Sequence, residues 1–291
     1  MTASAQQLDL SITICIRSAL ASGALQPIAT EQLTIEDQGI PFVVRWVPAL
    51  ARKRLKTVTD SGRRPDYNPF LPHDPALEVS ALGPAHVALL NKFPVMDRHL
   101  LVITREYAPQ TAPLTGSDFA ALWSIIMRLG GMGFCNGGRD AGASQHHKHL
   151  QWIPARPDDA TSVPVAVALA GADPRATLNP VPALPFGHAF CRFDDDLENA
   201  GADAGSLLHA CFSRLCADLG IDSEDNPLPP YNLLLTRRWM LVVRRSRESW
   251  QRMSINSLGY AGLLFVPEQS QLEVVTQTGP LNILKAVTAP R

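Results

Sequence analysis

The chain has 291 residues, of which 46% are hydrophobic and 18% charged, a composition typical of a soluble globular protein with a sizeable core. A formal net charge of −1 gives no basic surface for nucleic acid, and no apolar run approaches the roughly 18 residues of a membrane helix. The five cysteines are odd in number and lack CxxC spacing, so we expect reduced thiols and a cytoplasmic protein.

Hydrophobic periodicity predicts the first elements of the chain. Apolar residues three and four positions apart predict an amphipathic helix over 5–22, and an extended run follows over 41–47. Two short runs of β-forming residues, over 86–90 and 100–104, predict strands joined by a turn-like connection.

A helix and a Gly-rich loop are expected next. Ser117 is the predicted N-cap, the helix continues to Leu129, and glycines end it. The segment from Gly130 to Gly142 is expected to be a loop whose backbone N–H groups line an anion pocket.

Prolines recur at seven positions between 154 and 185, which argues against a long regular element. We therefore predict an N-terminal half over 1–155, a Pro-rich crossover over 156–185, and a C-terminal half over 186–291 that completes the site.

The C-terminal half is predicted to hold a helix over 205–219 and strands over 232–236, 240–245 and 263–266. Its first two strands loosely resemble the earlier strand pair. This resemblance predicts two related halves.

Three histidines within four positions follow the Gly-rich loop. The segment over 147–153 ends in β-forming residues and predicts a strand, in which side chains alternate between two faces. One predicted face carries two imidazoles and an amide, and the other carries an amine and an apolar anchor: His147, His149 and Gln151 against Lys148, Leu150 and Trp152.

His149 is the predicted nucleophile, because a neutral imidazole with a pKa of about 6.5 has a nitrogen lone pair available near pH 7. Its attack on a nucleotide α-phosphorus would give a phosphoramidate. Gln151 can donate an N–H to a phosphate oxygen, but it cannot protonate a leaving group. The pair therefore suits a leaving group that departs already ionised, such as ADP or ATP.

A zinc site is the main alternative for these histidines. No cysteine or carboxylate lies close in sequence to complete a tetrahedral set, so we assign no metal ligands. Five other histidines are scattered along the chain and are predicted to be structural: His73, His86, His99, His188 and His209.

The run His147-Lys148-His149-Leu150-Gln151 resembles the His-x-His-x-Gln signature of the transferase branch of the histidine-triad superfamily. The resemblance is closest to the diadenosine tetraphosphate phosphorylase (ATP adenylyltransferase) family, and its further segments follow in family order. These segments are Asn68-Pro69-Phe70, residues 89–93, Gly142-Ala143-Ser144-Gln145, residues 231–234 and residues 255–262.

The resemblance implies a role for particular residues. His149 would carry AMP covalently, His147 would belong to the catalytic set, and Gln151 would contact the α-phosphate. The implied substrate-binding residues are Lys53, Asn91, Lys92, Asn136, Gly142, Ala143, Ser144, Gln145, Asn256, Ser257 and Leu258. The chain departs from the family at Leu263 and Pro267, near the places of a methionine and a lysine.

The resemblance also implies an α+β fold: a histidine-triad-like antiparallel sheet with flanking helices and two related halves. The implied reaction is phosphorolysis of diadenosine tetraphosphate with phosphate to ADP and ATP. A divalent cation, Mg²⁺ by expectation, would bind the polyphosphate, with no organic cofactor and neither nucleic acid nor membrane as partner.

Two rival functions stay open. One is uridylyl or guanylyl transfer on a sugar nucleotide, although that branch commonly has His-Pro-His-Pro-Gln, from which Lys148 and Leu150 depart. The other is a nucleotide sensor without catalysis, which the intact His149 and Gln151 pair disfavours.

Overall fold

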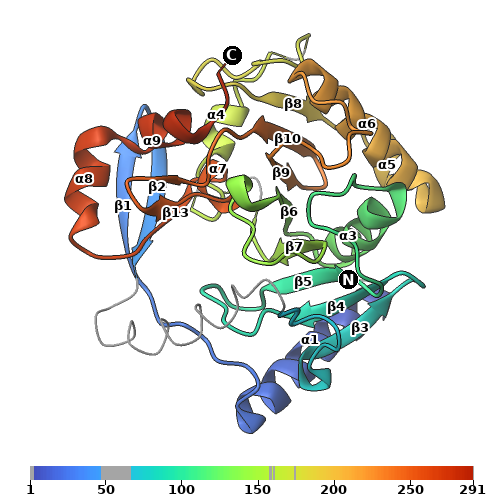
Figure 1. Cartoon of the computed structure of the whole chain (residues 1–291). Helices are drawn as coiled ribbons and strands as arrows, with labels where there is room; N and C mark the ends of the chain where they lie inside the picture. The colour runs from blue at the N-terminus through green and yellow to red at the C-terminus, as the bar shows by residue number, and fades with distance from the viewer. Residues whose placement is uncertain (1–2, 47–66, 157–158, 160, 174, 291) are drawn as a thin grey trace.

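The computed structural model describes residues 3–46, 67–156, 159, 161–173 and 175–290 (Figure 1). Its centre is an eight-stranded antiparallel sheet in the order β3-β4-β5-β7-β6-β9-β10-β8. The strands are β3 (Glu78–Leu82), β4 (His86–Leu90), β5 (Leu100–Thr104), β6 (Met132–Gly137), β7 (His149–Ile153), β8 (Ala189–Arg192), β9 (Tyr231–Leu235) and β10 (Trp239–Arg244). The predicted α+β class with an antiparallel sheet is confirmed.

A second sheet has three strands, and a short hairpin forms a separate two-stranded sheet. In the order β1-β2-β13, the first pair is antiparallel and the second is parallel. These strands are β1 (Glu31–Asp37), β2 (Ile40–Trp46) and β13 (Leu263–Val266), and the hairpin is β11 (Ser249–Trp250) with β12 (Met253–Ser254). Because β2 and β13 pair, an early segment of the chain and a late one meet in one sheet.

Helices cover one face of the large sheet, and the small sheet with the C-terminal helices covers part of the other (Figure 1). The longer helices are α1 (Ala3–Ser22), α3 (Gly116–Leu129), α6 (Ala204–Asp218), α8 (Gln271–Thr278) and α9 (Pro280–Val287). The short ones are α4 (Ala166–Leu169), α5 (Asp196–Asn199), α7 (Ser257–Tyr260), η1 (Pro75–Leu77), η2 (Arg139–Ala141) and η3 (Gly201–Asp203). Among the described residues, no helix is both long and apolar enough to cross a membrane.

The inner strands of the large sheet, such as β4, β6 and β9, are buried on both faces, and they are mostly apolar on both sides. On β5, Leu100 and Val102 pack in the core under α1, α3 and α6, whereas Ile103 belongs to a small cluster with Phe70 on the opposite face. The site described below lies on that opposite face, between this small cluster and the core formed by the C-terminal helices.

The predicted N-cap of α3 was wrong by two residues. Thr115, not Ser117, caps the helix: its Oγ1 accepts from the Asp118 N–H, and the Asp118 carboxylate accepts from the Thr115 N–H. This reciprocal pair stabilises the first turn because it satisfies two backbone donors that have no partner within the helix.

The prediction of a loop over 130–142 was wrong for residues 132–137, which form the central strand β6. Gly133 is required there by packing: a Cβ at this position would lie 2.6 Å from Leu122 Cδ2 of α3. A glycine that lets a helix approach a strand closely looks, in sequence, like a glycine in a loop.

The two related halves correspond differently from the prediction. The sheet order places β5-α3-β6-β7 and β8-α6-β9-β10 as two units of the same topology, which meet where β6 pairs with β9. The pair β9-β10 therefore matches β6-β7, and not β4-β5 as the sequence suggested. The sheet continues across this junction. The predicted boundaries of the two halves, at 155 and 186, stay a prediction.

Candidate functional site

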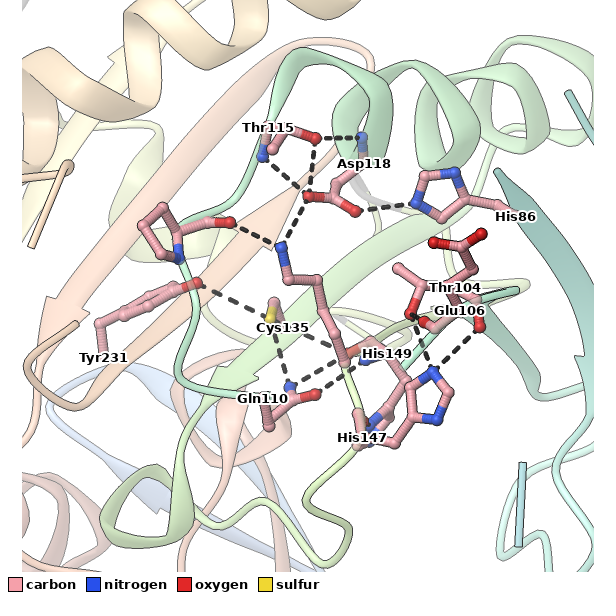
Figure 2. A network of polar contacts seen from close by, with 12 residues as sticks. His86, Thr104, Glu106, Gln110, Thr115, Asp118, Cys135, His147, His149 and Tyr231 are labelled. Carbon is pink, nitrogen blue, oxygen red and sulfur yellow. Dashed lines mark hydrogen bonds and ion pairs between the residues drawn. The ribbon is translucent and has the colours of Figure 1, made fainter. Parts of the chain in front are cut away.

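The site lies where β6 and β7 separate. Their ladder ends at the pair Phe134 and Gln151, and the Gln110 side chain fills the gap that follows. Gln110 Oε1 accepts from the His149 N–H at 2.8 Å, and its Nε2 donates to the His149 carbonyl at 3.1 Å (Figure 2). The same Nε2 donates to the Asn136 carbonyl at 2.8 Å. One buried amide thus replaces the strand pairing and holds the His149 backbone. Gln110 was not predicted as a site residue, and its local sequence carries no signal for this role.

His149 is held in one tautomer. Its Nδ1–H donates to the His147 carbonyl at 2.9 Å, because a carbonyl oxygen can only accept. The lone pair therefore resides on Nε2, which no described residue hydrogen-bonds. The side chain is 3% exposed, and its ring centroid lies 5.5 Å from that of Phe70.

Burial, with a smaller contribution from the nearby His147 ring, lowers the pKa of His149 to about 4, although the hydrogen bond to the His147 carbonyl opposes the shift. The imidazole is therefore neutral at pH 7, which is the form that can act as a nucleophile.

The pH dependence of the site follows from this low pKa. We expect the rate of His149 modification by a nucleotide substrate to stay level from pH 8 to about pH 5 and to fall with a midpoint near 4, instead of about 6.5 for a free imidazole. A midpoint near 6.5 would contradict the lowered pKa that burial gives to His149. Unfolding is measured in parallel, because the unfolded imidazole binds more protons between these two values, so stability falls as the pH drops through that window.

His147 has both ring nitrogens occupied. Nε2–H donates to the Thr104 carbonyl at 2.9 Å and lies 2.8 Å from Thr104 Oγ1, so Nδ1 accepts from Asn68 Nδ2 at 3.0 Å. The ring is therefore not available to a phosphate or a metal ion, and His147 acts on His149 through its carbonyl. Within the described part of the chain, no cluster of three or more His, Cys, Asp or Glu side chains could hold a metal. A direct catalytic role for His147 stays a prediction.

β7 begins at His149, two residues later than predicted, but the alternation of faces is confirmed. Lys148 and Trp152 point to the helical face. Lys148 Nζ donates to the Pro113 carbonyl at 2.6 Å and to Asp118 Oδ2 at 3.2 Å (Figure 2), and Trp152 Nε1–H donates to the Gly130 carbonyl. His86 Nε2 contacts the other Asp118 oxygen at 2.8 Å. This buried network anchors the strand from behind.

Gln151 is linked to the predicted nucleotide contact Asn91 through His99. Gln151 Oε1 lies 2.9 Å from His99 Nε2, and Asn91 Nδ2 lies 3.1 Å from His99 Nδ1. His99 was predicted to be merely structural, but it joins two of the predicted site residues.

Asn136 and Ser257, both predicted to bind substrate, bind each other. Asn136 Oδ1 accepts from the Ser257 N–H at 2.9 Å and from Asn232 Nδ2 at 3.0 Å, and the Ser257 hydroxyl donates to the Cys135 carbonyl. Buried Arg245 donates in turn to Asn232 Oδ1. This network brings β6, β9 and α7 to the same place. Arg245 and Asn232 were not predicted as site residues.

The other predicted residues of this region also make internal contacts. Asn256 Oδ1 caps α7 by accepting from the Leu258 N–H, and the Leu258 side chain is buried in the core. The N–H groups of Gly142 and Ala143 donate to Arg139 and Gly138, so the loop does not present all its N–H groups to a ligand as predicted. Substrate contacts by these residues stay a prediction.

Gly142 allows the loop over 142–145 to lie against the segment before α7. It has a φ of +87°, and a Cβ there would lie 2.6 Å from the Ile255 carbonyl oxygen and 2.8 Å from Asn256 Cβ. Two segments distant in sequence, both predicted to bind substrate, are therefore adjacent.

We expect Gly142→Ala to lower kcat/KM for the nucleotide substrate on the order of 10-fold, because a small displacement of binding groups is costly. Gly23→Ala is the matched control: its φ of +75° carries a similar backbone cost, roughly 1–2 kcal/mol, but nothing lies within 4 Å of the added Cβ. Equal activity of the two variants would show that the contact with Asn256 is unimportant.

The remaining predicted residues lie at the margin or outside the described residues. Lys92 is exposed, with Nζ 5.8 Å from the Phe93 ring centroid, and Ser144 is exposed. Gln145 is half-buried. Lys53, with the rest of the basic run over 52–56, lies outside the described residues.

Comparison with known proteins identifies two matching family models. One, described as the Ap4A phosphorylase N-terminal domain, matches residues 1–171, and the other, described as the ATP adenylyltransferase C-terminal domain, matches residues 182–290. Together they account for nearly the whole chain.

Similar proteins come from the yeast Saccharomyces cerevisiae (strain ATCC 204508 / S288c). Protein APA1 is 29% identical over 287 residues, covering 90% of this chain and 87% of APA1. Diadenosine 5',5'''-P1,P4-tetraphosphate phosphorylase 2 is 29% identical over 265 residues, covering 81% of this chain and 79% of that protein.

Solved structures of yeast Ap4A phosphorylase Apa2 have the same fold. The complex with AMP matches with a TM-score of 0.76 and 25% identity, covering 98% of this chain and 97% of the yeast chain. The complex with Ap4A matches with a TM-score of 0.76 and 25% identity, covering 97% of each chain.

Proposed function

Because this chain belongs to the Ap4A phosphorylase family of ATP adenylyltransferases, we propose that it degrades diadenosine tetraphosphate by phosphorolysis through a covalent adenylyl-His149 intermediate. The chain is an enzyme of the nucleotidyltransferase class. The observation that carries the proposed mechanism is the fixed tautomer of His149, which leaves the lone pair on Nε2.

In the first step, His149 Nε2 attacks the α-phosphorus of one adenylate. A P–N bond forms while the bond to the bridging oxygen breaks, and ATP leaves with the bonding electron pair. The imidazole then carries a positive charge, and the Nδ1–H bond to the His147 carbonyl at 2.9 Å stabilises that charge.

In the second step, phosphate attacks the same phosphorus from solution. A new P–O bond forms, the P–N bond breaks, and the products are ADP and neutral His149. Gln151 supplies N–H donors to the α-phosphate oxygens in both steps. Because Gln151 cannot act as an acid, the leaving group must depart ionised, and ATP can do so near pH 7.

Substrate binding is proposed for the segments that converge beside His149. The loop over 142–145 and the residues Asn256, Ser257 and Leu258 are adjacent across Gly142, and Asn136 joins them to β6. Mg²⁺ would enter as part of the substrate, bound by polyphosphate oxygens with no dedicated protein cage. We also propose a cytoplasmic location, where ATP and phosphate are available and thiols stay reduced.

Product analysis tests this function. With Ap4A and phosphate we expect ADP and ATP in equal amounts, and without phosphate we expect no net turnover beyond one equivalent of ATP. Rapid release of AMP without phosphate would identify a hydrolase instead. A parallel assay with UDP-, ADP- and GDP-sugars tests the sugar-nucleotide alternative, and binding without any turnover would identify a sensor.

A further inference from the structure

A line of hydrogen bonds leads from a backbone amide to Gln151. The line starts at the Phe93 N–H, which can only donate and which donates to Asn91 Oδ1 at 3.3 Å. The Asn91 amide is thereby oriented, so its Nδ2 donates to His99 Nδ1 at 3.1 Å. At each step, the donor fixes which atom of the next side chain accepts, and this orients that side chain.

His99 in turn orients the Gln151 amide by a hydrogen bond. Because Nδ1 accepts, the proton of the neutral imidazole lies on Nε2, which donates to Gln151 Oε1 at 2.9 Å. His99 is 5% exposed, and burial lowers its pKa to about 4, so the ring keeps one proton at pH 7.

The remaining end of the line is the NH₂ group of Gln151. Its Oε1 faces His99, so the two N–H donors point away from His99. Gln151 and His149 lie two residues apart on β7 and share one face of the sheet.

We propose that His99 is a positioning residue that keeps the Gln151 amide in the one orientation in which it donates to the transferred phosphoryl group. An amide can rotate by half a turn with almost no change in shape, and the flipped form would aim a carbonyl oxygen at phosphate oxygens. The bond from His99 removes that alternative. This inference rests on the proposed transfer of a nucleotidyl group to His149.

A double-mutant cycle separates positioning from a general structural effect. We expect His99→Phe to lower kcat for Ap4A phosphorolysis on the order of 10-fold, with a smaller change in KM, because a donor to the phosphate oxygens is lost part of the time. In the Gln151→Ala background the same substitution should change kcat less than about 2-fold, since no amide remains to be oriented. An equal loss in both backgrounds, or no loss in either, would overturn the proposal.

His188→Phe is the matched control for losing a buried imidazole. His188 is fully buried, donates from Nδ1 to the Phe186 carbonyl and accepts at Nε2 from the Val181 N–H. It precedes β8, at the far edge of the sheet from β7. If its folded variant loses as much kcat as His99→Phe, the effect of His99 is not specific.

The tautomer of His99 can be measured without any substrate. In ¹⁵N NMR spectra of the wild-type protein at pH 7, we expect His99 to be neutral with the proton on Nε2, and the Nε2 signal to shift in Gln151→Ala. A proton on Nδ1 would overturn the proposal even in a fully active enzyme. If the tautomer is as expected but the wild type does not cleave Ap4A, the proposed function fails while the geometry holds.

Discussion

Replacing His149 with alanine is expected to lower kcat/KM for Ap4A phosphorolysis on the order of 10⁴-fold or more, because the variant has lost the proposed nucleophile. His149 is the group whose tautomer, backbone and pKa are all fixed by named contacts: His147 and Gln110 hold it, and burial keeps it neutral. The assay measures ADP and ATP release under saturating phosphate, with folding checked by circular dichroism.

His146→Ala is the control for this variant. His146 is exposed, and its ring packs against Tyr107. Its substitution should change kcat/KM less than about 3-fold, as for other exposed positions. Residual turnover of 1% or more in His149→Ala would mean that phosphate attacks the dinucleotide directly, without a covalent step.

Replacing Lys148 with methionine is expected to reduce the free energy of unfolding by about 3–5 kcal/mol, because it leaves the buried Asp118 without its ammonium partner. Burial opposes ionisation of Asp118, but the hydrogen bond from His86 and the charge of Lys148 keep the pKa of its carboxyl below the ordinary value. Urea denaturation at pH 7 measures the loss.

An exposed ion pair provides the control for Lys148→Met, and the pH dependence of the stability loss provides a second test. Arg238→Met breaks an exposed ion pair with Asp195 and should cost less than about 1 kcal/mol. The difference between wild type and Lys148→Met should shrink as the pH falls through the lowered pKa of Asp118, because a protonated carboxyl no longer attracts the ammonium group. A difference that does not depend on pH would assign the loss to packing alone.

Local periodicity was sufficient for much of the fold. The strands over 86–90, 100–104 and 263–266 have the predicted bounds, because each is a mostly apolar run whose residues are buried or half-buried. The strand β6 was missed for a physical reason: Gly133 is there to admit Leu122 of α3, and a sequence does not reveal which glycine serves packing.

The predicted site residues that the structure brings together by strand alternation lie close in sequence. The residues that were missed lie far from His149 and Gln151 in sequence. His149 and Gln151 were assigned to one face by alternation along a strand, which the structure confirms. Gln110 lies 39 residues before His149, and His99 lies 52 residues before Gln151. Both act through hydrogen bonds across the sheet, and no spacing rule within one strand predicts such partners.

The resemblance to a family located the segments but not their connections. It assigned Asn136 and Ser257 to substrate, and the structure shows that they first hold each other. A buried amide that fixes a second segment can shape a site without touching the ligand. For Asn136, therefore, loss of activity on substitution would not by itself establish substrate contact.

The proposed mechanism requires a covalent bond between His149 and AMP. The wild-type protein is incubated with Ap4A in the absence of phosphate, digested under alkaline conditions and mapped by mass spectrometry. We predict AMP on the peptide that contains His149, stable to base, labile to acid, and released as ADP when phosphate is added before digestion. Full turnover with no AMP on that peptide, or the same adduct in His149→Ala, would contradict the account.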